Sequence, residues 1–169
     1  WAAAEGMIFD EYDAFVHLVD RFIPDADWQR FWVVDFGYAN PLVFQCWCMD
    51  NDGRLYLMHE IYQTKLLVED LAALIKTWRI REREPFPTAL ICDWDAEDRK
   101  TLERHLGIET TAANKSVLAG IQEVKSRLKK DERGRPRLFF MRDALEEIDP
   151  DLDDAKLPCS TVQEIEGYE

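Results

Sequence analysis

WVVDFGYANP, residues 32–41, places a carboxylate at the end of a buried strand. The bulky apolar side chains from Phe31 to Val34 are typical of a strand that is covered on both faces, and Asp35 follows them within the same run. An unpaired charge in such a place costs several kcal/mol or shifts its pKa. The sequence therefore predicts either that a cation meets Asp35 or that its side chain faces solvent.

Length and composition predict one globular domain. The chain has 169 residues, of which 47% are apolar and 12% are aromatic, and this is enough to bury a sizeable core. The longest apolar stretches have the length of strands, and the first residues lack the basic start and apolar middle of a signal peptide. We therefore expect an intracellular protein without a membrane-spanning segment.

The cysteines and histidines form no recognisable metal motif. The cysteines include no CxxC pair, and the histidines lie far apart without an HxH or HxxxH pair. We expect reduced cysteines that pack in the core and ordinary histidines, rather than a disulfide or a zinc site. These residues are Cys46, Cys48, Cys92, Cys159, His17, His59 and His105.

The distribution of charge along the chain is compatible with binding to nucleic acid. A net charge of −13 argues against it, because phosphate binding needs a basic footprint. Residues 142–169, however, hold ten acidic and two basic residues, a balance of −8, so the first 141 residues carry only −5. The segment KSRLKKDERGRPR, residues 125–137, holds seven Lys or Arg against two acidic residues. This basic strip is either a solvated helix end and turn or a contact surface for phosphate.

Apolar periodicity predicts three strands that run back and forth, followed by alternating helices and strands. A turn rich in Asp and Asn, DNDG at residues 50–53, joins the second strand to the third. Thr64 can cap the first helix, and Asp95 and Gly107 can begin and end the second. The predicted strands are 31–36, 42–50, 54–62, 88–93, a brief one at 108–110, and 137–140; the predicted helices are 64–78, 94–107, 115–130 and a short one at 141–148.

This order is that of a ribonuclease H-like α/β fold, a mixed sheet of three antiparallel strands and then parallel strands, flanked by helices. The fourth strand then lies beside the first and parallel to it, at a spacing of about 4.8 Å. Asp35 and Asp93, at the ends of these two strands, can reach the same ion. Their oxygens suit Mg²⁺ or Mn²⁺, and two such ions can support phosphodiester cleavage. The two Asp residues could equally cap a helix or bind a loop amide.

Several motifs in order resemble the C-terminal nuclease domain of the large terminase subunits of tailed bacteriophages. The motifs are WVVDFGYANP, ICDWDAED and NKSVLAGIQEVKSRL, and the resemblance covers roughly residues 1–141. The opening WAAAEGMIFDEYDAFVHLVDRF is similar to the segment that joins that domain to the packaging ATPase. The resemblance implies a metal-dependent endonuclease that cuts concatemeric double-stranded viral DNA during packaging, in the cytoplasm of the infected host cell.

The resemblance also implies roles for particular residues. By motif match, Asp35 and Asp93 are the metal ligands of a two-metal Mg²⁺ or Mn²⁺ site. Asp95 is an auxiliary acid or, as we expect, a helix cap. Glu60 is a further ligand or a solvent-facing strand carboxylate between apolar neighbours. Residues expected to approach the DNA backbone are Lys115, Lys125, Arg127, Lys129, Lys130 and Arg133; Lys115 could also simply precede a helix cap.

Two departures from the family define the expected domain organisation. No GxxxxGK[ST] loop occurs, so the chain cannot itself be the motor. The third acidic motif of the family is absent, so we expect the chain to stop short of it, with DPDLDDAKLP (149–158) as a loop whose acids are conceivable substitutes. We expect residues 1–30 to be a linker toward an absent ATPase domain, 31–148 the nuclease domain, and 149–169 a truncated acidic segment.

The expected partners are double-stranded DNA, the ATPase domain of the same polypeptide, and the portal and small terminase subunit. Two other interpretations stay open from the sequence. One is a different ribonuclease H-like enzyme, such as a junction resolvase or an integrase-type transferase. The other is a non-catalytic acidic docking module that binds a portal or small subunit through its tail. The second interpretation predicts no metal binding and no loss of function on Asp35→Ala.

Overall fold

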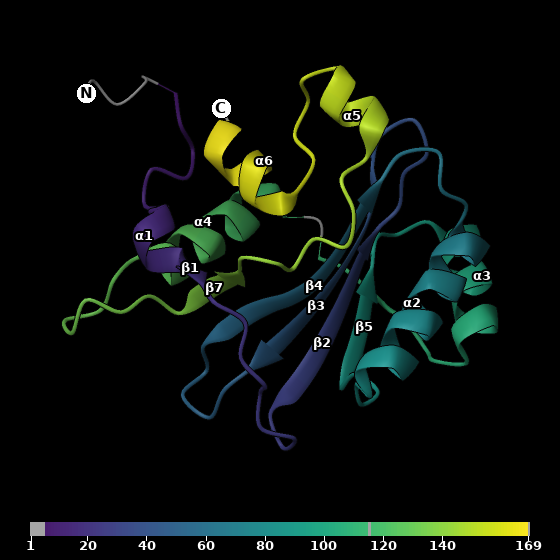
Figure 1. Ribbon diagram of the computed structural model, residues 1–169, viewed down its shortest axis with the longest axis horizontal. Coiled ribbons are helices and arrows are strands. Elements are labelled where there is room, and N and C mark those ends of the chain that lie inside the picture. The colour runs from purple at the N-terminus through teal and green to yellow at the C-terminus, as the bar shows by residue number, and fades with distance from the viewer. Residues whose placement is uncertain (1–5, 115, 169) are drawn as a thin grey trace.

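The computed structural model describes residues 6–114 and 116–168 and arranges them as a seven-stranded sheet with helices on both faces (Figure 1). The strand order is β1-β7-β4-β3-β2-β5-β6. The strands are β1 (Leu18–Val19), β2 (Gln29–Asp35), β3 (Leu42–Met49), β4 (Leu55–Gln63), β5 (Ala89–Cys92), β6 (Thr111–Ala112) and β7 (Leu138–Met141). The helices are α1 (Ala14–His17), α2 (Val68–Glu82), α3 (Ala96–Leu106), α4 (Val117–Leu128), α5 (Pro150–Asp154) and α6 (Thr161–Gly167). None of the helices in the described ranges is long and apolar enough to cross a membrane.

The centre of the sheet confirms the predicted strand arrangement. β2, β3 and β4 pair antiparallel in sequence order, and β5 lies beside β2 and parallel to it. The predicted turn joins β3 to β4, where Asp50 Oδ1 accepts hydrogen bonds from the backbone N–H groups of Asp52 (3.0 Å) and Arg54 (2.8 Å). Gly53 has φ +81°, a conformation that favours glycine.

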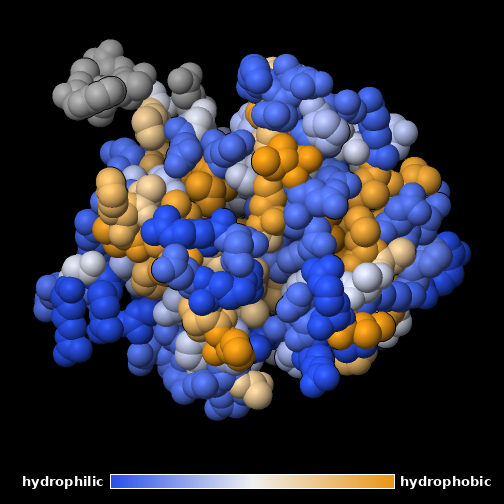
Figure 2. Space-filling model, in the orientation of Figure 1, coloured by the Kyte–Doolittle hydropathy of each residue, from blue (hydrophilic) through white to orange (hydrophobic). Residues whose placement is uncertain are grey.

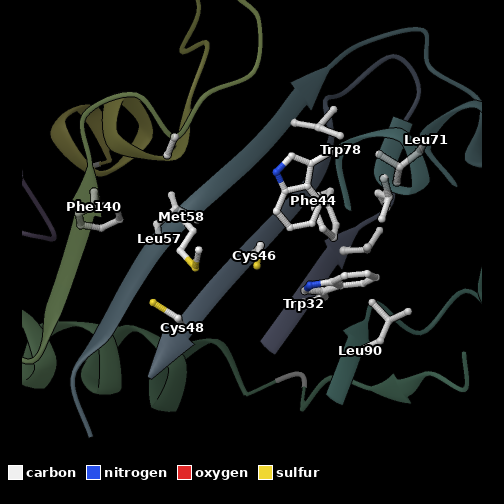
Figure 3. Packing of buried hydrophobic residues seen from close by; sticks show 14 of the residues in the cluster. Trp32, Phe44, Cys46, Cys48, Leu57, Met58, Leu71, Trp78, Leu90 and Phe140 are labelled. Atoms are coloured by element: carbon white, nitrogen blue, oxygen red, sulfur yellow. The ribbon is translucent and has the colours of Figure 1, made fainter. Parts of the chain in front are cut away.

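The sheet face covered by α2 and α3 carries the aromatic core (Figure 3). Trp32 of β2, Phe44 of β3 and Trp78 of α2 form a triangle with ring centroids 5.5 to 6.0 Å apart. Such edge-to-face and tilted pairs add about 0.5–1.5 kcal/mol each beyond the area they bury. All four cysteines are free thiols buried in the structure, and their burial agrees with the prediction that they pack in the core.

A β-bulge at Met58 determines which side chains of β4 face each helix layer. The pairing with β3 passes from Leu57 directly to His59, so Met58 has no partner residue on that strand. Side chains alternate between the two faces of a strand, so one extra residue shifts the alternation by one. Glu60 and Tyr62 therefore share a face with Leu57, and His59 points to the opposite face, where it stacks on the indole of α2 with ring centroids 4.5 Å apart.

Residues 141–148 do not form the predicted short helix. Their backbone pairs with β4 instead: Glu60 N–H donates to Ala144 O and Glu146 N–H donates to Glu60 O, both at 2.8 Å. Since these groups find partners in the sheet, the segment follows β4 rather than coiling. The predicted brief strand at 108–110 was also misplaced, because β6 begins at Thr111.

The first residues of α2 differ from the prediction. The N-cap is Leu67, which makes no side-chain capping bond, and the helix begins at Val68. Thr64, the predicted cap, instead donates from its N–H (2.6 Å) and its hydroxyl (2.8 Å) to Asp149 Oδ2. Asp149 thereby ties the end of β4 to the start of α5.

The acidic C-terminal segment is helical where a loop was predicted. Asp149 caps α5 by accepting from Asp151 N–H at 2.8 Å. Ser160 caps α6 by accepting from Gln163 N–H at 3.3 Å, and Gln163 Oε1 accepts from Cys159 N–H at 2.7 Å. This reciprocal pattern resembles a capping box, which fixes the start of a short helix.

The segment for which a linker was predicted also contacts the sheet and the C-terminal helix. β1 pairs parallel with β7, with Leu18 opposite Phe140. Phe9 is 8% exposed and belongs to the hydrophobic core. Ile8 N–H donates to Tyr168 O at 2.9 Å, so the beginning and end of the described chain lie together.

Candidate functional site

Asp35 and Asp93 lie at neighbouring positions at one end of the sheet. Asp35 is the last residue of β2, and Asp93 directly follows β5. Val34 and Cys92 are opposite each other in the parallel pair, and Asp93 N–H donates to Val34 O at 3.2 Å. The structure therefore brings the two acids together by the strand pairing that the sequence predicted.

The environment of Asp35 is negatively charged. Burial of its carboxyl raises its pKa above the ordinary value, and the charges of Asp93 and then Glu164 raise it further. Asp35 and Glu164 line one cavity of about 550 Å³, together with Asn40 and Thr161. The negative charges of Asp35, Asp93 and Glu164 repel one another, and a bound cation would offset that repulsion.

Contacts from β4 hold α6 over the sheet, so that Glu164 lies beside Asp35. Thr161, the first residue of α6, donates from its N–H (3.0 Å) and from its hydroxyl to Glu60 Oε1. Gln45 of β3 donates to the same hydroxyl at 2.6 Å. Tyr62 O–H donates to Glu164 Oε1 at 2.7 Å. Glu60 and Gln45 thus hold the first residue of α6, and Tyr62 contacts the Glu164 carboxylate directly.

Glu60 is not the solvent-facing carboxylate that alternation along β4 suggested. It is 2% exposed, and burial raises its pKa. The bulge at Met58 turns its side chain toward α6, where its hydrogen bonds are to Thr161. Its contacts are those of a residue that positions α6.

Glu164 was missed by the sequence reasoning, which looked for the third acid beyond residue 169. The spacing of Ser160 and Gln163 was a usable signal for a helix start. That signal does not say which way the helix faces. The orientation comes from contacts with Glu60 and Tyr62, which are about a hundred residues away in the sequence.

Asp95 caps α3, as predicted. Its Oδ1 accepts from Asp98 N–H at 2.8 Å. Asp95 and Asp93 line a second cavity of about 510 Å³, which Tyr38 and Glu69 also border. Across residues 6–114 and 116–168, no three His, Cys, Asp or Glu side chains form a group that could hold a metal ion.

The loop after β2 requires glycine at position 37. A Cβ at Gly37 would lie 2.5 Å from Pro41 O and 2.6 Å from Asn40 O, which is closer than real Cβ contacts. The chain therefore folds back on itself directly after Asp35. As a result of this turn, Phe36 lines both cavities.

The basic strip lies at the other end of the sheet from the acids. β3 begins beside Asp35, which pairs with Val43, and it ends at the turn that contains Gly53. Arg127 donates to Gly53 O at 3.3 Å, which places the end of α4 at that turn. The structure does not bring the strip and the acids together.

Several of the predicted DNA-binding residues are engaged in ion pairs. Lys125 lies 3.4 Å from Asp10, Arg127 lies 2.7 Å from Glu123, and Lys130 lies 3.8 Å from Asp13. Lys129 and Arg133 are exposed. Lys115 lies outside the described residues.

Comparison with solved structures identifies the fold. The chain is similar to the large terminase from a thermophilic bacteriophage (crystal form 2), with a TM-score of 0.67 and 22% identity over 83% of this chain and 34% of that chain. It is also similar to the P22 large terminase nuclease domain, with a TM-score of 0.64 and 14% identity over 82% of this chain and 73% of that one. The chain thus spans about a third of the thermophilic phage protein. No family model and no curated protein matches it. The similarity confirms, at the level of the fold, the predicted resemblance to a ribonuclease H-like terminase nuclease domain.

Proposed function

We propose that this chain is a divalent-metal-dependent DNA endonuclease domain of the terminase type. The observation that carries the proposal is the meeting of Asp35 and Asp93 at the paired ends of β2 and β5, with Glu164 of α6 beside Asp35. The acidic end of a ribonuclease H-like sheet supports phosphodiester chemistry, and the similarity to large terminase structures favours the terminase type over a junction resolvase or an integrase-type transferase.

The donor set fits Mg²⁺ or Mn²⁺. All three groups are carboxylates, and hard oxygen ligands are those that these ions prefer. When bound, the ions would activate water and stabilise the leaving oxygen as water adds across a P–O bond. We propose Asp35, Asp93 and Glu164 as the ligands, in place of a third acid beyond residue 169. Because no three such side chains already form a metal-binding group among the described residues, the ions would have to draw these carboxylates together. Asp95 is then a cap, and Glu60 and Tyr62 position Glu164.

The chain's own residues supply the shape and rigidity of the site. Gly37 lets the loop after β2 turn back at once, so that Asn40 and Pro41 line the same cavity as Asp35. Tyr62 and Glu60 restrict α6, so the Glu164 carboxylate has few alternative positions. Because α6 is held in this way, moving Glu164 toward an ion would cost less ordering entropy than recruiting a flexible acidic tail.

The proposal extends to partners by similarity. The large terminase of the thermophilic phage has been solved with ADP and is about three times as long as the part that aligns with this chain. We infer that this domain works beside an ATPase domain, with double-stranded viral DNA as substrate, in the cytoplasm of an infected host. The portal and the small terminase subunit are the further partners we expect.

Metal-dependent plasmid nicking tests the proposal. The parental chain should nick supercoiled DNA with Mn²⁺ or Mg²⁺ and not in EDTA. Asp35→Asn, Asp93→Asn and Glu164→Gln should each abolish nicking. Glu166→Gln, an exposed carboxylate two residues further along α6, is the matched control and should cut at the parental rate. Nicking by Asp35→Asn or Asp93→Asn at the parental rate would overturn the metal site, and the same result for Glu164→Gln alone would remove the third ligand.

A further inference from the structure

The loop between α4 and β7, residues 129–137, is a concentrated positive charge on an acidic protein. This basic loop contains five Lys or Arg and two acidic residues, a balance of +3 in a chain of −13. All of its residues except Pro136 are exposed. It extends from the body of the molecule at the left of Figure 1, where Figure 2 shows a strongly hydrophilic cluster.

Hydrogen bonds give the basic loop a fixed shape. Asp131 Oδ1 accepts from the N–H groups of Arg133 and Arg135, both at 2.9 Å. Asp131 N–H donates to Arg135 O at 2.8 Å, and Gly134, with φ +74°, closes the turn. At the base of the loop, Leu55 N–H donates to Arg137 O at 3.0 Å, which ties it to β4. The cations are therefore displayed by an ordered turn.

The ligand of this loop must be recognised by charge. The loop exposes no apolar side chain, whereas protein–protein interfaces have an apolar core inside a polar rim. Within residues 6–114 and 116–168, no ion pair engages Lys129, Arg133 or Arg135. Exposed ammonium and guanidinium groups without an apolar core are typical of contacts to a phosphodiester backbone.

The distance between the basic loop and the acids follows from the sheet. β3 has eight residues and runs from the acidic end to the turn beside the loop. At about 3.4 Å per residue, β3 separates the acids from the base of the loop by roughly 24 Å, and the loop extends further outward from there (Figure 1). With a rise of about 3.4 Å per base pair, this distance corresponds to roughly seven base pairs of B-form DNA.

We propose that the basic loop binds the backbone of a DNA duplex that lies along β3, at least about seven base pairs from the bond that the acidic end cuts. The cutting part of this inference rests on the proposed nuclease function. The DNA-binding part rests on the charge of the loop alone. Binding and cutting would then be divided between the two ends of one sheet. A duplex too short to span both ends would lose the contribution of the loop.

Two measurements test the proposal on the full chain. The loop variant Lys129→Ala/Arg133→Ala/Arg135→Ala is compared with a control, Lys76→Ala/Lys100→Ala/Arg104→Ala, which removes three exposed cations from α2 and α3. Binding of a 20-base-pair duplex is measured in EDTA by fluorescence anisotropy between 50 and 200 mM salt. The loop variant should bind more weakly, and its log–log salt slope should flatten by about 0.9 for each phosphate that is no longer neutralised, or about 2.7 for three. The control should match the parent.

Cutting is measured per phosphate with Mn²⁺ on the 20-base-pair duplex and on a hairpin with a six-base-pair stem, which is about 20 Å long. The parent should cut the long duplex faster, and the loop variant should cut both at the same low rate. Unchanged affinity and salt slope in the loop variant would overturn the proposal. The loop would then be a solvated turn or a surface that contacts an acidic protein. A length preference retained by the loop variant would overturn the span. A parent that binds as expected but never cuts would refute the proposed nuclease while the DNA-binding part stands.

Discussion

Tyr62→Phe isolates the single hydrogen bond that orients Glu164. Tyr62 is 2% exposed, and its hydroxyl donates to Glu164 Oε1 at 2.7 Å. Phenylalanine keeps the ring and its packing, so the substitution removes the donor and little else. If Glu164 is a metal ligand that must be held in place, the change should slow cutting while the fold persists.

The size of the effect follows from the chemistry of the bond. A hydrogen bond to a charged group contributes about 1.5–3 kcal/mol, but Glu164 is exposed and water can replace part of it. We therefore expect a loss of about 1 kcal/mol in the free energy of unfolding. A similar free energy lost from orientation in the transition state corresponds to a rate about tenfold lower, since about 1.4 kcal/mol is a factor of ten.

The assay is the first-order rate of plasmid nicking at saturating Mn²⁺, with thermal unfolding in EDTA measured in parallel. Tyr12→Phe is the control, because the Tyr12 hydroxyl is buried and has no hydrogen-bond partner among the described residues. It should leave the rate unchanged and the stability equal or higher. Parental nicking by Tyr62→Phe, together with the expected small loss of stability, would show that Glu164 need not be oriented and would refute the reasoning.

Three further substitutions test separate parts of the site. Asp35→Asn should stop nicking and raise the melting temperature in EDTA at pH 7: the raised pKa means that the folded state binds this proton more tightly than the unfolded chain, so stability falls as pH rises through the shifted pKa. A lower melting temperature would contradict this. Gly37→Ala should cost about 1–3 kcal/mol and impair cutting because its Cβ would meet Pro41 O, whereas Gly120→Ala, with open space in α4, should be neutral or stabilising by calorimetry. Asp95→Ala should cost about 1 kcal/mol of stability as a lost cap and leave the cutting rate unchanged below the transition; a rate loss would make it a ligand.

The sequence predicted the acid pair because it depends on local patterns. Apolar runs located β2 and β5, and the rule that parallel strand ends meet at one edge placed Asp35 next to Asp93. The cap at Asp95 and the helix stop at Gly107 were equally local and are confirmed. These features involve residues close in sequence or a simple strand pairing.

The rest of the site depends on distant contacts. One extra residue, Met58, reversed the expected direction of Glu60, and no periodicity in the sequence marks a bulge. The position of Glu164 depends on the hydrogen bonds that Glu60 and Tyr62 of β4 make with α6, a helix of seven residues. The basic strip covers the end of α4 and the turn after it, and whether it contacts phosphate stays a prediction. Its distance from the acids depends on the direction in which α4 runs over the sheet, which the sequence pattern does not give.

The outermost strands of the sheet restrict how other molecules can join it. β1 and β6, the two edge strands, have two residues each, while the strands inside them have four to nine. An edge this short offers few unpaired backbone groups, which protects the protein from growing into intermolecular sheets. It also makes recognition by strand addition unfavourable, because such recognition needs an extended row of donors and acceptors. Neighbouring domains and copies of this chain should therefore dock through side chains on helices and loops. Mutations that lengthen β1 or β6 should increase aggregation.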